Sequence, residues 1–201
     1  MGKNDIVFDI ETKRSFQEVG GVNNMAKLGI SVLGAYFYET EKYRAFEEHE
    51  ILEFEKIIRE LAHKKHGRVI GFNINHFDLP VLQHYISWDL RELPSLDLMS
   101  DVENGAGFRI SLDNLSQNTL MAQKSGDGMK AIECYKEGKI DEIKKYCLKD
   151  VELIKNLYEY GTREGKVYFF KRDVMNKVSI TVNWSNNIYA KGRNTEQLSI
   201  F

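Results

Sequence analysis

The sequence has few cysteines and lacks any long apolar run. Cys134 and Cys147 are the two cysteines among 201 residues, and they form neither a CxxC pair nor a disulfide framework. This usage is typical of a reducing compartment. No apolar run approaches the ~20 residues of a membrane-spanning helix, and the N-terminus has no signal-peptide pattern. We therefore expect a cytoplasmic protein with no membrane partner.

Internal repeats and low-complexity segments are absent too, and the composition is that of an ordinary globular protein. Hydrophobic residues make up 42% of the chain and charged residues 29%. The net charge of −2 neither requires nor excludes a polyanionic partner, but residues 166–201 hold six basic and two acidic side chains. A basic C-terminal segment on an acidic body suits a metal site whose substrate is partly held by that segment. Chance unevenness explains the distribution equally well.

The order of predicted elements indicates an α/β fold. β-Branched and aromatic runs predict strands at 6–12, 28–38, 43–48, 68–72 and 93–98. Apolar residues at helical spacing predict helices at 50–64, 77–86, 112–121, 129–136 and 139–160. We expect a glycine-rich turn at 104–107 and a C-terminal β-hairpin from strands at 166–172 and 178–184. These elements describe a mixed β-sheet flanked by helices, with a hairpin extension.

The first predicted strand carries two carboxylates in an apolar context. Asp9 and Glu11 share one face of the strand, about 7 Å apart, because strand side chains alternate. Burying two bare anions is expensive unless a cation neutralises them, and a divalent metal ion would do so. Alternatively, the strand ends early and both carboxylates are solvated.

Two further acids occur at positions that a purely structural role explains poorly. Asp78 follows a strand-to-helix turn and, taken alone, is a good helix N-cap. Asp150 falls within an apolar helical stripe, and Tyr146 lies one turn before it. Taken alone, this pair is explained by a hydrogen bond in the core.

Taken in order, these residues resemble the motifs of the DEDD family of 3′–5′ exonucleases, which have a ribonuclease-H-like fold. The D-x-E motif is found at Asp9 to Glu11, N-x-x-x-[FY]-D at Asn73 to Asp78, and Y-x-x-x-D at Tyr146 to Asp150. The last spacing is similar to the tyrosine subclass, DEDDy, and the chain most resembles a bacterial branch. The resemblance implies an exonuclease domain over residues 1–165, followed by a basic hairpin extension and tail over 166–201.

The resemblance also implies a two-metal mechanism. Asp9 would bridge both ions, Glu11 and Asp150 would hold the ion that activates water, and Asp78 the ion beside the leaving group. Tyr146 would orient the attacking water. Oxygen ligands and the lack of a His/Cys cluster favour Mg²⁺ or Mn²⁺ over zinc.

Three other residues are candidates to position the terminal nucleotides. Asn73 and Phe77 belong to the second motif, and Phe16 lies in the loop after the first strand. Aromatic rings stack on bases, although core packing is the more common role for a residue such as Phe77 taken alone.

The C-terminal residues Gln197-Leu198-Ser199-Ile200-Phe201 resemble the bacterial sliding-clamp-binding motif, with Ile200 where leucine is usual. Gln197 would orient the peptide while Leu198, Ile200 and Phe201 enter an apolar pocket of the clamp. The alternative is a last strand that packs on the body.

We therefore expect a metal-dependent 3′–5′ exonuclease that acts on single-stranded 3′ ends in replication or repair, with DNA favoured by the clamp-like motif. The alternatives are an exoribonuclease that trims RNA, a structure-selective endonuclease, and a non-catalytic nucleic-acid-binding module of the same fold.

Overall fold

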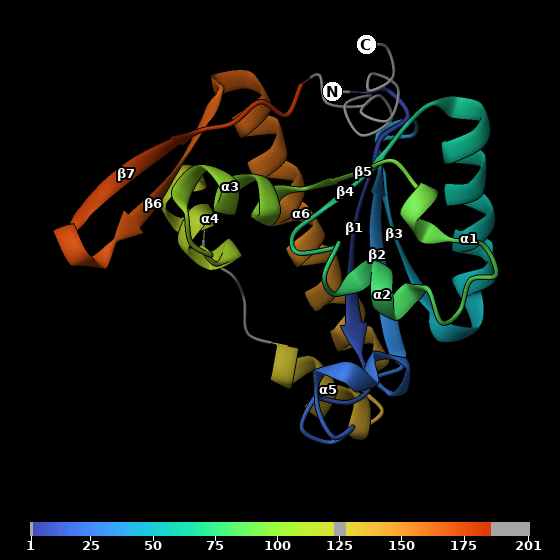
Figure 1. Ribbon diagram of the computed structural model, residues 1–201. Helices are drawn as coiled ribbons and strands as arrows, with labels where there is room; N and C mark the ends of the chain where they lie inside the picture. Colours follow the sequence, from blue (N-terminus) through green and yellow to red (C-terminus); the bar gives the residue numbers. More distant parts are fainter. Residues whose placement is uncertain (1, 123–127, 186–201) are drawn as a thin grey trace, which may run out of the picture.

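A mixed five-stranded sheet forms the centre of the molecule (Figure 1). The computed structural model describes residues 2–122 and 128–185. The strands of the sheet, in spatial order, are β3 (Lys42–Glu47), β2 (Ile30–Phe37), β1 (Ile6–Thr12), β4 (Val69–Gly71) and β5 (Ser95–Asp97). β1 pairs antiparallel with β2 and parallel with β4. The predicted α/β fold and mixed sheet are confirmed.

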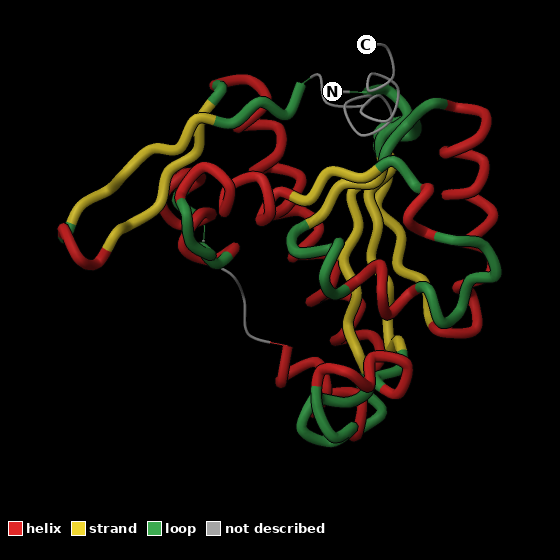
Figure 2. The backbone as a smooth tube through the Cα atoms, in the orientation of Figure 1, coloured by secondary structure: helices red, strands yellow, loops and turns green. Residues whose placement is uncertain are grey.

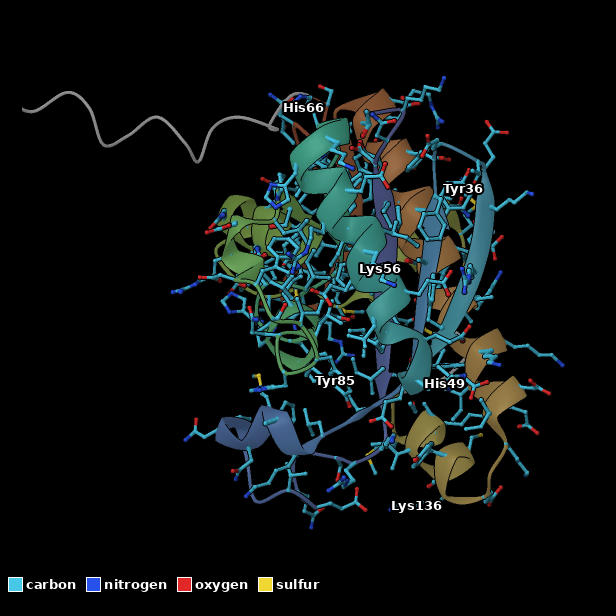
Figure 3. All side chains as sticks on the ribbon, turned by 90° about the vertical axis from the view of Figure 1, so that its right-hand side faces the viewer. Tyr36, His49, Lys56, His66, Tyr85 and Lys136 are labelled. Carbon is cyan, nitrogen blue, oxygen red and sulfur yellow. The ribbon has the colours of Figure 1, made fainter. Side chains whose placement is uncertain are left out.

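Helices cover both faces of this sheet. They are α1 (Ile51–Glu60), α2 (Asp78–Leu82), α3 (Leu98–Ala106), α4 (Leu112–Leu120), α5 (Gly128–Lys136) and α6 (Ile140–Glu164). Phe8 of β1 packs in the cluster that contains α1 and α2, whereas Val7 packs with α3, α4 and α6. Figure 3 looks from the α1 side, with Lys56 in front of the strands and α6 behind them. Alternate positions of β1 therefore face different helical layers, as strand geometry requires.

Shorter helical turns complete the connections. They are 3₁₀ turns at Val22–Lys27, Glu48–Glu50, Leu90–Glu92 and Arg172–Val174, and a π turn at Leu61–Lys65. Within residues 2–122 and 128–185 we find no helix with the length and hydropathy of a membrane span.

Helix α6 lies directly against β2 because Gly34 has no side chain. A Cβ atom at Gly34 would stand 2.8 Å from the Cys147 sulfur and 3.2 Å from a Val151 methyl carbon. Gly34 pairs with Asp9 across β1 and β2, so both face α6. This close approach brings the buried stripe of α6, including Asp150, to the sheet face that carries Asp9.

The prediction of a glycine-rich turn at 104–107 is wrong for its first three positions. Residues 104–106 form the last turn of α3, which ends at Gly107 with a φ of 81°. The side chain of Asp97 caps the helix by accepting the backbone N–H groups of Met99 and Ser100. This cap offsets the weak helix propensity of the glycine near the end.

The predicted C-terminal hairpin is confirmed as β6 (Lys166–Lys171) and β7 (Asn176–Thr181), a two-stranded sheet apart from the main one (Figure 2). Its inner face, with Val167 and Phe169, belongs to the cluster formed by α3, α4 and α6. The clamp-like residues Gln197, Leu198, Ile200 and Phe201 lie outside the described residues.

Candidate metal centre

A cavity of about 380 Å³ lies where β1, the turn after β4, α2, α5 and α6 meet. Its described walls include all four of the predicted acids, Asp9, Glu11, Asp78 and Asp150. Two come from β1, one from the start of α2 and one from the middle of α6. Acids that are far apart in the sequence therefore surround one space.

Asp9 and Glu11 lie on the α6 face of β1, where Cys147 joins them. The Cys147 thiol donates to the backbone carbonyl of Asp9 with a sulfur–oxygen distance of 3.4 Å. Potential ligand atoms of Asp9, Glu11 and Cys147 all lie within 4.8 Å of one another. In the sequence, Cys147 follows the apolar spacing of α6. That spacing does not predict that Cys147 borders the acids.

Asp78 points toward β1. It is the first residue of α2, with Phe77 at the N-cap position, and its Oδ1 accepts the backbone N–H of Ile10 at 2.9 Å. The N-cap interpretation of Asp78 is therefore wrong. The carboxylate links α2 to the strand that carries Asp9 and Glu11.

Buried carboxylates line the cavity. Asp150, Asp78 and Glu11 are only 1%, 2% and 6% exposed. Among the described residues that line the cavity, only Arg14 is basic, and its side chain is exposed. A set of carboxylate oxygens fits Mg²⁺ or Mn²⁺ by its chemistry.

The thiol of Cys147 does not change this chemistry. Burial raises its pKa well above the ordinary value, and the negative charges of Asp9 and Glu11 raise it further. A protonated thiol is a poor metal ligand. The site therefore offers hard oxygen donors despite the nearby sulfur.

Comparison with known proteins agrees with this geometry. The family model of the RNase_H superfamily matches residues 6–162. The chain belongs to the RNase_H superfamily. No curated protein matched the sequence. The matched region begins at β1 and ends in the last turn of α6, so it contains all four acids.

Membership of the RNase_H superfamily indicates a general class of function. Its nucleases generally hydrolyse nucleic acids and typically use divalent metals. A nuclease-type function and an acidic metal-binding cluster are thus consistent with both the family and the cavity.

Tyr146 lies one turn before Asp150 on α6 of this RNase_H domain. Its ring packs against the cluster that includes Ala131 and Cys134 of α5. Within the described part of the chain it is not one of the residues that line the cavity. The predicted role of Tyr146 in orienting water stays a prediction.

The three predicted nucleotide-positioning residues do line the cavity. Phe16 and Phe77 pack edge to face, with ring centroids 5.8 Å apart, and both are half-buried against the core. Asn73 adopts a left-handed conformation with a φ of 68°, where the chain turns between β4 and α2. These residues form an aromatic and polar wall beside the acids.

Asp97 is a structurally important acid that sequence reasoning missed. It is 4% exposed at the end of β5, and it accepts the backbone N–H groups of Asn73 and Asn75. The available signal was an acid between two leucines, Leu96 and Leu98, in a predicted strand. Asp97 fixes the turn that leads to Asp78.

Proposed function

We propose that this RNase_H superfamily protein is a metal-dependent 3′–5′ exonuclease of the DEDDy type. The observation that supports this most directly is the convergence of Asp9, Glu11, Asp78 and Asp150 on one cavity. Their order along the chain and their spacing resemble those of the DEDD exonucleases.

The acids have distinct roles in this proposal. Asp9 would contact both of two Mg²⁺ or Mn²⁺ ions, Glu11 and Asp150 the first ion, and Asp78 the second. When bound, such an ion pair supplies a nucleophilic water at neutral pH and neutralises charge on the leaving oxygen. The Ile10 N–H holds the Asp78 carboxylate in position before any ligand arrives.

The neighbouring residues would bind and orient the substrate. Phe16 and Phe77 offer ring surfaces for the terminal base, and Asn73 offers an amide beside them. Tyr146, one turn from Asp150, would orient the attacking water. Its ring is partly buried against the cluster that contains Ile143 and Ala131.

A digestion panel tests this proposal. The 201-residue chain with Mg²⁺ or Mn²⁺ is mixed with single strands of DNA or RNA that carry a label at the 3′ or the 5′ end. We expect labelled mononucleotides from 3′-labelled DNA and a ladder of shortened products from 5′-labelled DNA. Internal fragments from both labels would indicate an endonuclease. Faster digestion of RNA than of DNA would indicate an exoribonuclease. Binding without cleavage would indicate a non-catalytic module.

Asp150→Asn provides the residue-specific arm of that experiment. The substitution keeps the size of the side chain but removes the charge that would bind metal, so we expect digestion to fall by at least about a thousandfold. Asp141→Asn is the matched control, because Asp141 lies on the same helix with an exposed side chain. Digestion by Asp150→Asn at the wild-type rate would show that Asp150 takes no part in the reaction.

The C-terminal motif supports DNA as the substrate and a sliding clamp as the partner. We propose that Gln197, Leu198, Ile200 and Phe201 bind the bacterial clamp and recruit the enzyme to replication or repair sites. A pull-down with the clamp compares the full chain with a chain that ends at Glu196. Equal recovery of the two chains would contradict this partner.

A further inference from the structure

An exposed arginine stands beside the cavity. Nη2 of Arg109 donates to Oδ1 of Asn73 at 2.7 Å, and Asn73 lines the cavity. The Arg109 side chain is 56% exposed and also pairs with Glu103, with 3.5 Å between Nε and Oε2. Such an exposed ion pair contributes little stability, so exchanging Glu103 for a phosphate costs little.

The preceding residue, Phe108, reaches the hairpin. Its ring centroid lies 5.7 Å from that of Phe169 and 5.6 Å from Nζ of Lys171. Phe108 remains 41% exposed although it is a large apolar side chain. An exposed ring beside a cation is a typical base-stacking position in single-strand-binding proteins.

The backbone holds these two residues outward. Gly107 ends α3 with a positive φ, and Ile110 is buried again at 3% exposure. Only Phe108 and Arg109 lie between them, so adjacent residues connect the cavity at Asn73 to the hairpin at Lys171. Lys171 lies two residues after the inward-facing Phe169 on β6 and therefore shares its face, which places Lys171 on the Phe108 side of the hairpin.

From this arrangement we infer that Arg109, Phe108 and Lys171 form a track that binds the single-stranded nucleic acid upstream of its 3′ end. The inference rests on the proposed function and extends it by assigning the path of the substrate from the cavity to the hairpin. Arg109 and Lys171 contact phosphates, and Phe108 stacks on a base between them. Among the basic residues of the segment 166–201, Lys171 thereby acquires a specific role.

The outer face of the same hairpin provides a matched control. Lys166 and Lys177 lie 5.7 and 4.6 Å from the Tyr168 ring centroid. Lys177 pairs with Phe170 in the register, so it lies on the face opposite Phe169. Replacing Lys166 and Lys177 removes as much charge as replacing Arg109 and Lys171, but it leaves the track intact.

The test measures binding of a labelled dodecathymidylate to the full chain by fluorescence anisotropy in EDTA, which prevents cleavage. We expect Phe108→Ala to weaken binding about five- to tenfold through lost stacking. The double variant Arg109→Ala/Lys171→Ala should bind still more weakly, with a salt-dependence slope reduced by about one to two. Phe108→Leu keeps apolar contact with Phe169 and should bind as weakly as Phe108→Ala, and unchanged melting temperatures confirm that the variants fold.

The control variant Lys166→Ala/Lys177→Ala distinguishes a specific track from general electrostatic attraction between the basic hairpin and the nucleic acid. The inference stands if this variant binds at least several times more tightly than Arg109→Ala/Lys171→Ala. Equal weakening of the two double variants, wild-type binding by Phe108→Ala, or no binding by the wild-type chain at low salt overturns it.

A parallel digestion with Mg²⁺ separates this inference from the proposed function. If the wild-type chain digests the dodecamer but the track variants bind like wild type, the track is wrong and the exonuclease proposal survives. If the track variants lose binding but the wild-type chain cleaves nothing, the exonuclease proposal fails and the track remains.

Discussion

The carboxylate of Asp97 accepts a hydrogen bond from the backbone N–H of Asn73, with 2.8 Å between Oδ1 and the nitrogen. Its other oxygen accepts the N–H of Asn75 at 3.0 Å. Asn73 has a left-handed backbone, which is uncommon for a residue other than glycine. A buried acid on β5 thus stabilises the turn from β4 to α2, and that turn presents Asp78 to the cavity.

We predict that Asp97→Asn destabilises the protein and impairs the site together. The substitution keeps the shape of the side chain but turns an NH₂ group toward a backbone N–H, which costs about 1–3 kcal/mol of unfolding free energy. Displacement of Asp78 should also raise the Mg²⁺ concentration needed for half-maximal digestion. Urea unfolding and metal titration measure the two effects.

Asp89→Asn is the control for Asp97→Asn. Asp89 also accepts a backbone N–H, that of Arg91, but it does so at the protein surface. We expect its metal requirement to be that of the wild type. A wild-type metal requirement in Asp97→Asn would show that the turn does not depend on the carboxylate.

Gly34→Ala should separate α6 from the sheet. The added Cβ would meet the Cys147 sulfur at 2.8 Å, so the helix must shift and carry Asp150 away from Asp9. We expect a loss of about 1–3 kcal/mol in unfolding free energy and a larger proportional loss of nuclease activity. Chemical denaturation and digestion rates provide the two measurements.

The double variant Gly34→Ala/Cys147→Ala tests the cause of that loss. Removing the sulfur makes room for the new methyl group, so the double variant should recover part of the stability lost by Gly34→Ala. The recovery is partial because Val151 and Leu148 also contact the added atom. Strict additivity of the two single substitutions would contradict direct contact between positions 34 and 147.

The site could be predicted from the sequence because several of its acids occur in apolar surroundings. Asp9, Glu11 and Asp150 interrupt hydrophobic patterns. The period of each pattern predicts which face of the strand or helix the acid occupies, and the structure places each acid on that face. Asp78 required the ordered motif, because its local context taken alone favours an N-cap. The mixed sheet followed from element order, since short strands and long amphipathic helices differ in period.

Tertiary contacts could not be predicted in the same way. Asp97 acts on backbone groups more than twenty residues earlier in the chain, as its bonds to Asn73 and Asn75 show. Gly105 and Gly107 together favour a turn, yet the helix that begins at the Asp97 cap continues past Gly105 to Ala106. Helical spacing correctly put Tyr146 one turn from Asp150, but only the structure shows that its ring packs against the cluster that contains Ala131 and Cys134.

The hairpin should stabilise the whole domain. Trp184 is fully buried, stacks on Tyr158 with ring centroids 6.4 Å apart, and its carbonyl accepts a hydrogen bond from Arg68. A chain that ends at Gly165 loses these contacts. Loss of the tryptophan contacts alone should cost about 3–5 kcal/mol, and thermal unfolding measures the change.

A chain that ends at Ser185 is the control for that truncation, because it keeps Trp184 and both strands of the hairpin. We expect it to unfold at a clearly higher temperature than the chain that ends at Gly165. If the chain ending at Gly165 unfolds at the same temperature as the chain ending at Ser185, residues 1–165 form an autonomous domain and the hairpin is an independent addition.

The raised pKa of Cys147 gives the stability a specific dependence on pH. Burial, followed by the charges of Asp9, Glu11 and Asp150, keeps the thiol protonated in the folded protein. The unfolded chain releases that proton above about pH 8.5, whereas the folded chain retains it. The contribution of Cys147 is therefore complete below this pH and decreases above it, by up to about 1.4 kcal/mol for each pH unit.

Urea unfolding from neutral pH to about pH 9.5 measures this dependence, because most tyrosines stay protonated over that range. Cys147→Ala removes the titrating group while Cys134 remains, so it should lose stability less steeply than the wild type above about pH 8.5. Alkylation reports the same property directly: iodoacetamide should modify Cys147 rapidly in urea and very slowly in the folded protein, since the thiolate is the reactive form. Parallel pH curves for wild type and Cys147→Ala, or rapid alkylation of folded Cys147, would mean that the thiol ionises normally. The three acids would then exert no appreciable field on the sulfur beside them.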